Sequence, residues 1–131
     1  MNYLLKIATG TFLTLCIGQP LLANESASHP LVGKWISNKE ASLQELNKAG
    51  LASQEINKLS FLFGKMVVVI KNDTYTTILN EQVNETPYSI ISTSNGCFKV
   101  KFEQDISELC IKNNMLYVPS YKGSKEVFNK I

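Results

Sequence analysis

Arginine is absent from this chain of 131 residues, so all 13 basic side chains are lysines. Any site that needs the planar, two-pronged grip of a guanidinium on a carboxylate or phosphate is therefore excluded. The lysines are scattered among 11 acidic residues and leave a net charge of only +2. Because nucleic-acid-binding proteins present clustered basic surfaces, the composition argues against nucleic acid as a partner.

The chain also lacks the residue combinations on which most hydrolytic and metal chemistry depends. Its one histidine, His29, has no acidic or cysteine cluster in metal-ligand spacing near it. No serine stands in a Gly-x-Ser-x-Gly motif, and the carboxylates Glu103 and Asp105 flank a predicted turn, where solvated side chains are normal. We therefore expect neither an enzyme, nor a metal site, nor a cofactor.

Only one long apolar run is present, and it lies at the N-terminus. The run from Ile7 to Leu22 follows a single lysine, is interrupted by Gln19-Pro20, and precedes the small residue Ala23. This pattern predicts a signal peptide over residues 1–23 and a mature domain over residues 24–131. No other stretch reaches the ~18 apolar residues of a membrane span, so we expect an extracytoplasmic protein, periplasmic or secreted, without a stable span.

The N-terminus admits two other interpretations. Leu13 to Cys16 has the outline of a bacterial lipoprotein processing site, in which Cys16 becomes the acylated first residue. Leu15 argues against this, because the residue before the modified cysteine is small in such sites. An uncleaved, anchored form is the second alternative.

Two of the three cysteines, Cys97 and Cys110, lie in the predicted mature domain. The alternation of apolar and polar residues around them predicts two strands with both cysteines on the polar face. A hairpin that turns over residues 103–106 brings Cys97 opposite Cys110 or one diagonal step away, within reach of a disulfide. Such a bond fits an oxidising compartment, whereas a redox or metal pair lacks a Cys-x-x-Cys spacing.

Two periodicities follow one another along the mature domain. After a short strand over Leu31 to Ile36, two short helices are predicted, the first capped by Ser42 and ended by Gly50, the second capped by Ser53 and ended by Gly64. The period then changes to two, and turn signals separate seven further strands. These strands are predicted over residues 66–70, 75–79, 88–93, 97–102, 107–112, 115–119 and 125–131.

Eight antiparallel strands with short links predict an all-β fold. We expect a small up-and-down barrel with a helical hairpin between strands one and two, because closure removes the exposed edges of an open sheet. A two-residue turn at Asn95-Gly96 sets the register, since directly opposed residues share a face. Leu116 and Val118 belong to the predicted inward face. The candidate ligand-binding residues on that face are Ser89, Ile91, Thr93, Phe98, Val100, Phe102, Leu109 and Ile111.

Two short motifs resemble those of the lipocalin and fatty-acid-binding protein (calycin) superfamily. They are Gly33-Lys34-Trp35 in the first strand and Phe128-Asn129-Lys130 in the last. The helical pair resembles the lid of the fatty-acid-binding branch, while the signal peptide and disulfide resemble an exported lipocalin. The resemblance implies that Trp35, Phe128 and Lys130 form a structural plug, with Lys130 in place of the arginine that stacks on the tryptophan. The arginine–tyrosine clamp that holds a fatty-acid carboxylate has no counterpart here.

Two functions fit these features. The first is a carrier of a small apolar ligand inside the barrel, with the helical pair, from Ser42 to Phe63, as a lid over its mouth. The second is an interaction module with a filled barrel, such as an inhibitor or an immunity-type protein, whose protein partner the sequence does not identify. Polar Ser89 and Thr93 on the predicted inner face favour a cavity. Because arginine is missing, we expect uncharged ligands to bind in preference to free fatty acids.

Overall fold

A computed structural model describes residues 29–131 of the chain. The predicted signal peptide over residues 1–23 and the alternative processing site at Cys16 lie outside the described residues. The described elements, in chain order, are β1 (Gly33–Ser37), α1 (Lys39–Lys48), α2 (Ser53–Leu59), β2 (Val67–Ile70), β3 (Thr74–Leu79), β4 (Gln82–Ser94), β5 (Cys97–Phe102), β6 (Ile106–Lys112), β7 (Met115–Pro119), the short 3-10 helix η2 (Tyr121–Gly123) and β8 (Lys125–Lys130).

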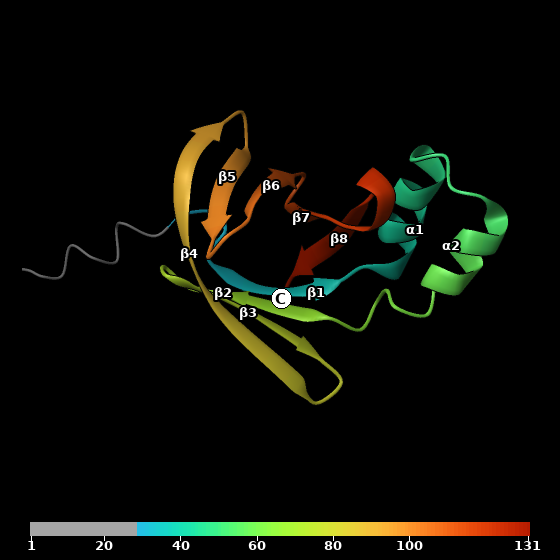
Figure 1. The fold of residues 1–131 in the computed structure, drawn as a ribbon, viewed down its shortest axis with the longest axis horizontal. Coiled ribbons are helices and arrows are strands. Elements are labelled where there is room, and N and C mark those ends of the chain that lie inside the picture. The colour runs from blue at the N-terminus through green and yellow to red at the C-terminus, as the bar shows by residue number, and fades with distance from the viewer. Residues whose placement is uncertain (1–28) are drawn as a thin grey trace, which may run out of the picture.

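The strands form one closed antiparallel barrel in chain order, β1 to β8 (Figure 1). Each strand pairs with the next, and β8 pairs back with β1, so that Trp35 lies opposite Lys130. The helices α1 and α2 lie between β1 and β2 in the chain and stand together at one end of the molecule. The predicted eight-stranded barrel with a helical hairpin after its first strand is therefore confirmed.

Asparagine and glycine form the tight turns between strands. Asn95 and Gly96 have φ values of 53° and 79°, and Asn113 and Asn114 have φ values of 52° and 64°. Both central residues of these turns thus have positive φ, as a type I′ hairpin turn requires. Asparagine and glycine tolerate this left-handed conformation, so these turns fix the pairing of β4 with β5 and of β6 with β7.

The predicted helix caps are wrong at α1. Asn38, not Ser42, caps its N-terminus, and its side-chain oxygen accepts a hydrogen bond from Ala41 N at 3.0 Å. Ser42 lies inside the helix and is fully buried against β8, where its Oγ accepts a hydrogen bond from Val127 N at 2.8 Å. Asn38 follows directly on β1, so the chain turns from strand to helix one turn earlier than the capping pattern at Ser42 indicated.

The second helix is also shorter than predicted. It begins at Ser53, with Ala52 as its N-cap residue, and ends at Leu59 rather than at Gly64. Three apolar residues after the helix differ in exposure: Phe63 is buried, whereas Phe61 and Leu62 are 70% and 55% exposed. The irregular backbone after Leu59 separates these side chains, which a continuous helix would also have placed on different faces.

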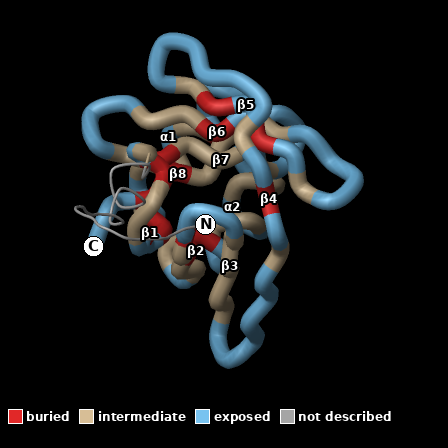
Figure 2. The backbone as a smooth tube through the Cα atoms, turned by 90° about the vertical axis from the view of Figure 1, so that its left-hand side faces the viewer, coloured by how far each residue is buried: buried red, intermediate tan, exposed pale blue. Residues whose placement is uncertain are grey.

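Most of the buried side chains form one cluster inside the barrel, while the tip of the β3–β4 hairpin is exposed (Figure 2). Leu46, Phe63 and Val127 are also buried but do not belong to this cluster; α1 packs against β8 outside the barrel. The barrel interior is therefore filled over much of its length. The cluster comprises Leu31, Trp35, Val68, Ile70, Tyr88, Phe98, Val100, Leu109, Leu116 and Phe128.

A register shift in β4 overturns part of the predicted inward face. The pairing with β5 is irregular between Ile90 and Ser92, which leaves Ile91 as an extra residue in the ladder. On the N-terminal side of this bulge, Ser89 lies opposite Lys101 and is exposed. Ile91 itself is 50% exposed. Ser89 and Ile91 were therefore wrongly placed inside the barrel. Because one extra residue exchanges the two faces of a strand, Tyr88 and Ile90 take their place.

The predicted disulfide between Cys97 and Cys110 is present. The two residues lie directly opposite each other on β5 and β6, with Cα atoms 4.0 Å apart. Their neighbours Phe98 and Leu109 point into the core, so the bond lies on the outer surface of this hairpin. Among residues 29–131, no helix is long and apolar enough to cross a membrane.

Candidate functional site

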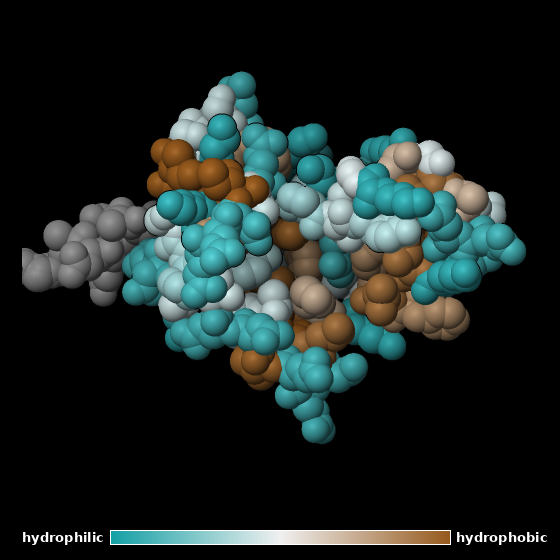
Figure 3. Space-filling model, in the orientation of Figure 1, coloured by the Kyte–Doolittle hydropathy of each residue, from teal (hydrophilic) through white to brown (hydrophobic). Residues whose placement is uncertain are grey.

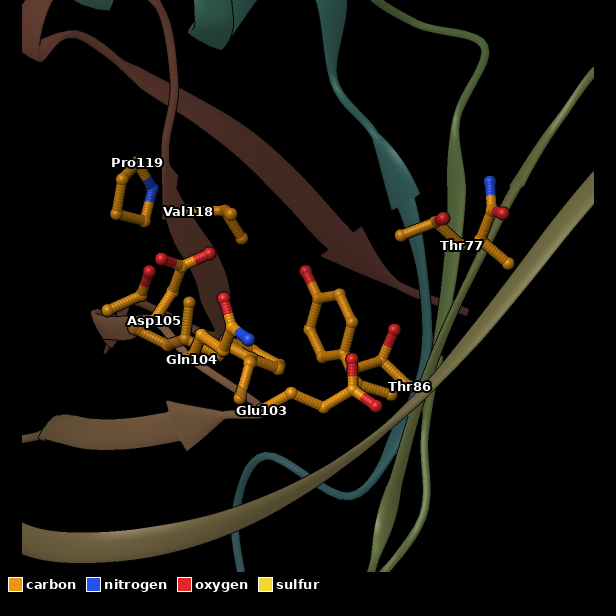
Figure 4. Close-up of a pocket in the computed structure, with 12 residues that line it drawn as sticks. Thr77, Thr86, Glu103, Gln104, Asp105, Val118 and Pro119 are labelled. Carbon is orange, nitrogen blue, oxygen red and sulfur yellow. The ribbon is translucent and has the colours of Figure 1, made fainter.

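Strands β3 to β7 surround a pocket of about 480 Å³ that we call the mouth pocket. Thr77 and Thr86 lie on one side of it, and the β5–β6 turn lies on the other with Val118 and Pro119 (Figure 4). The residues that line it are Tyr75, Thr77, Asn84, Thr86, Phe102, Glu103, Gln104, Asp105, Ser107, Leu109, Val118 and Pro119.

The long strand β4 accounts for the opening. Its first half, from Gln82 to Pro87, pairs with β3, and its second half, from Tyr88 onward, pairs with β5. β5 ends at Phe102, opposite Tyr88, so the β3–β4 hairpin continues beyond the end of β5. Pro87, which has no N–H to donate, stands where the pairing changes. The pocket occupies the space between the two diverging hairpins.

The pocket combines a polar entrance with an apolar floor. Thr77, Asn84 and Thr86 share the inward face of β3 and β4, because Thr77 pairs with Asn84 and Tyr75 pairs with Thr86. Deeper in the barrel the buried cluster begins, to which Leu109 belongs. A hollow near the middle of the face seen in Figure 3 has apolar side chains in its depth and hydrophilic ones around it.

Tyr75 and Phe102 form an aromatic pair in the wall of the pocket. Their ring centroids are 5.1 Å apart with an edge-to-face angle of 76°. Burial, together with the negative charge of Glu126, raises the pKa of the Tyr75 hydroxyl well above its ordinary value. The hydroxyl is therefore neutral at physiological pH. Among the described residues it makes no hydrogen bond.

A half-buried carboxylate lies beside this pair. Glu126 on β8 is directly opposite Val118, a residue of the pocket wall, so the two share the inward face of the barrel. Burial raises the pKa of the Glu126 carboxyl, and a hydrogen bond from Ser37 opposes that shift. Glu126 is not one of the twelve lining residues; it lies behind them, next to Tyr75 and Val118.

Two hydrogen bonds fix the position of the Glu126 carboxylate. The Ser37 hydroxyl donates to Glu126 Oε2 at 2.6 Å, and the Gly64 backbone N–H donates to Ser37 Oγ at 2.9 Å. Ser37 is the last residue of β1, and Gly64 lies in the segment between α2 and β2. The helical insertion thus contributes to the site through its backbone. Within residues 29–131, no hydrogen bond reaches the other carboxylate oxygen, Oε1.

The helical pair does not cover the pocket. All twelve lining residues come from β3 to β7 and the turn between β5 and β6. α1 packs against β8 instead, where Ser42 contacts the backbone of Val127. The lid predicted over Ser42 to Phe63 is therefore wrong in this form. α1 flanks the barrel because its buried residue Ser42 is bonded to the backbone of β8 at Val127.

The structure divides the predicted ligand-binding residues into three groups. Phe102 and Leu109 line the mouth pocket. Phe98 and Val100 lie in the packed core, and Ile111 packs against it, so none of these three lines the pocket. Thr93 faces Phe98 but is exposed, and Ser89 and Ile91 lie outside the barrel, as described above.

Sequence reasoning missed most of the polar residues of the site. Thr77 lies in the strand predicted over residues 75–79, for which the sequence indicated no inward face. Asn84 and Thr86 lie between that strand and the next predicted one. Glu126 was placed in a strand, but its face was not assigned. The signal that could have found them is period-two alternation: Tyr75, Thr77, Asn84 and Thr86 occupy alternate positions on both sides of the turn at Asn80.

Trp35, Phe128 and Lys130 cluster where β1 meets β8. Trp35 and Phe128 are almost completely buried, and Lys130 Nζ lies 5.3 Å from the centroid of the Trp35 ring. The indole Nε1 donates a hydrogen bond to Leu31 O at 3.0 Å. Lys130 therefore makes a cation–π contact with Trp35.

One group of metal-ligating side chains occurs in the described part of the chain. It comprises Cys97, Glu108 and Cys110, and it lies on the outer surface of β5 and β6. Because the two sulfur atoms are bonded to each other, the thiolate ligands that a metal requires are not offered.

Comparison of the sequence with models of known protein families and with curated proteins gives no match.

Proposed function

We propose that this chain is an exported, lipocalin-like protein that binds a small molecule in the mouth pocket of its barrel. The observation that carries the proposal is the pocket itself, with a volume of about 480 Å³ and a half-buried carboxylate beside it. Ligand sites in proteins commonly have volumes of roughly 300–1,000 Å³ and combine apolar walls with a few convergent polar groups. The mouth pocket has both characteristics.

Several features support a place among the lipocalin-like proteins. The barrel has eight antiparallel strands in chain order, and Trp35 of the Gly-x-Trp motif is buried beneath Lys130 of the last strand. The Cys97–Cys110 disulfide supports an oxidising, extracytoplasmic location, in agreement with the signal peptide predicted over residues 1–23. The proposal is for ligand binding in the mouth and not for catalysis, because within residues 29–131 the half-buried acid Glu126 has no histidine as a hydrogen-bond partner.

The ligand suggested by this pocket is small and only partly apolar. Phe102, Leu109 and Val118 offer an apolar wall for part of the ligand, while Thr86 and Ser107 offer hydroxyl groups. The packed core below excludes a long chain from the full depth of the barrel. A short apolar molecule with one polar end matches this division better than a long fatty acid.

The proposal is tested by measuring binding of a neutral fluorescent apolar probe to the purified mature protein. We expect saturable binding that Leu109→Glu abolishes, because the substitution introduces a charge at the floor of the pocket. The matched control is Ile91→Glu, which adds the same charge on the exposed outer surface of β4. Circular dichroism must show that both variants are folded. Absence of probe binding to the folded wild-type protein would remove the carrier proposal.

An interaction module is the second candidate, and a row of apolar side chains on the outside of the barrel favours it. Ile36 pairs with Val67, Val67 with Ile78, and Ile78 with Val83, so the row crosses β1 to β4. Val83 is 61% exposed. A photoreactive residue at position 83, compared with one at position 108 on the opposite hairpin, distinguishes the candidates: a crosslinked partner specific to position 83, without probe binding, supports the module.

A further inference from the structure

We propose that the mouth pocket selects organic cations: small molecules with a protonated amine that lies against Glu126 and an apolar part that lies on Phe102 and Leu109. This inference rests on the proposed function and adds the chemical class of the ligand. It goes beyond the expectation of an uncharged apolar ligand, because it assigns a charge to the ligand and a partner in the protein.

The charged residues that line the pocket have one sign. Glu103 and Asp105 belong to its lining, Glu126 lies behind it, and its twelve lining residues include no lysine. Lys130 also lies on β8, but its ammonium group lies over the Trp35 ring. A pocket with such charges favours cations and repels carboxylates and phosphates.

Glu126 is half-buried and has no cationic partner among the described residues. The ion pairs in the described part of the chain are Lys48–Glu45 and Lys122–Glu55, both on the surface. Glu126 receives one hydrogen bond, from the neutral hydroxyl of Ser37. Because partial burial disfavours the charged carboxylate, a cation beside Glu126 would stabilise that charge.

The groups near Glu126 match the hydrogen-bonding capacity of an ammonium. An alkylammonium has three N–H donors and no acceptor. Glu126 Oε1 and the Tyr75 hydroxyl oxygen both lack a hydrogen-bond donor among residues 29–131, and the charge of Glu126 acts on Tyr75. Both oxygens therefore keep acceptor capacity for the ammonium group of the proposed ligand.

The aromatic pair adds a second attraction for a cation. Tyr75 and Phe102 are both in the pocket wall, with ring centroids 5.1 Å apart. An ammonium within ~6 Å of an aromatic face is attracted by the ring, and the attraction increases when water is excluded. The same rings provide apolar surface for the carbon skeleton of the ligand. One wall thus serves both parts of an amine-bearing molecule.

The test compares three ligands of equal chain length: octylamine, octanol and octanoate. Each displaces the neutral fluorescent probe from the wild-type protein at pH 7, where the amine is protonated and the acid ionised. We expect octylamine to bind about tenfold more tightly than octanol, because a hydrogen bond to a charged group raises the affinity by about a factor of ten. Octanoate should bind most weakly.

Glu126→Gln is the decisive variant. It keeps the shape of the side chain and an oxygen that can accept from Ser37, but removes the charge. We expect the preference for octylamine over octanol to disappear while octanol affinity is retained. The matched control is Glu108→Gln, the same substitution at an exposed position on the outer face of β6. It should leave the preference unchanged.

The outcomes separate this inference from the proposed function. If octanol binds wild-type protein as tightly as octylamine, or if Glu126→Gln keeps the preference, the assignment of a cationic ligand is overturned while the carrier remains. If no ligand displaces the probe and the probe does not bind the folded protein, both are overturned. The ranking of the three ligands on the wild-type protein decides the question even if the variant does not fold.

Discussion

Ser42 replaces a neighbouring strand as the hydrogen-bond partner of Val127. The Ser42 hydroxyl accepts from Val127 N at 2.8 Å and donates to Val127 O at 3.4 Å, while Asn38 N also donates to that carbonyl at 2.7 Å. β1 ends at Ser37, so the backbone of β8 would lose its partner at this point. The first turns of α1 therefore continue the edge of the barrel with a side chain, which joins the helix to the sheet.

Removal of this hydroxyl should destabilise the whole domain. In Ser42→Ala the buried Val127 N–H loses its acceptor, so we expect the free energy of unfolding to fall by about 1–3 kcal/mol. Urea denaturation followed by circular dichroism measures the change. Ser53→Ala, at an exposed position in the first turn of α2, is the control and should change stability by less than ~0.5 kcal/mol. Equal stability of the two variants would contradict the role assigned to Ser42.

The disulfide should contribute measurably to stability. Cys97 and Cys110 are separated by 13 residues, and a loop of this length corresponds to ~3 kcal/mol in the chain-entropy account. We expect the Cys97→Ser/Cys110→Ser double variant to unfold at correspondingly lower urea concentration. The folded, air-oxidised mature protein should show no titratable thiol, and detection of two would be incompatible with the bond.

Trp35 should report folding through its fluorescence. The indole is almost completely buried and donates to Leu31 O, so native emission should be blue-shifted and poorly quenched by iodide. Trp35→Ala should lower stability by about 3–5 kcal/mol because it leaves a large cavity. Lys130→Gln removes only the cation over the ring and should lower stability by ~1 kcal/mol or less. A larger loss of stability in Lys130→Gln than in Trp35→Ala would contradict this account of the contact.

Acid should destabilise the protein partly through His29. Its Nε2 lies 3.0 Å from the Tyr88 hydroxyl, which itself donates to Lys71 O, so Nε2 carries the proton. Its Nδ1 is buried without a partner within residues 29–131, and burial lowers the pKa of the imidazole below its ordinary 6.5.

The unfolded chain therefore binds a proton at His29 before the native protein does. Stability from this residue is present above about pH 6.5 and decreases as the pH falls below it. Urea titrations at pH 7.5 and 5 should show this loss, and His29→Gln should reduce it. An unchanged pH dependence in the variant would exclude His29 as its source.

Glu126 should have the opposite effect on stability. Burial raises the pKa of its carboxyl, so the native protein holds the proton more firmly than the unfolded chain. The contribution of Glu126 to stability therefore decreases as the pH rises from about 4.5 through the raised pKa. We expect Glu126→Gln to be more stable than wild type at pH 7 and to lose that advantage at pH 4. A variant less stable than wild type at pH 7 would contradict this account.

The hairpins of the barrel were predictable because their turns depend on local chemistry. β5 and β7 have the bounds that the sequence predicted, and each follows a turn of asparagine or glycine with positive φ. The first half of β4 was not predicted, because it contains Asn84, Glu85 and Pro87, residue types that have low strand propensity. Pairing with β3 overrides that propensity.

The site was less predictable than the fold because it depends on contacts between distant residues. Ser37 and Glu126 are 89 positions apart in the chain, and their hydrogen bond exists only because β8 closes on β1. The bulge at Ile91 has no glycine or other local signal, yet it exchanges the inner and outer faces of the preceding residues. Alternation alone therefore placed Ser89 inside the barrel and gave no reason to choose Tyr88.

The closure between β1 and β8 has a consequence for how the protein folds. Every other strand pair joins neighbours in the chain, whereas this pair joins the two ends of the described chain. Bringing distant segments together carries the largest loop-closure entropy, and such contacts slow folding. A chain that is delivered from its N-terminus exposes an unpaired edge on β1 until β8 has emerged. We infer that Trp35 is shielded by Lys130 only in the final step, so its fluorescence marks the moment at which the barrel is complete.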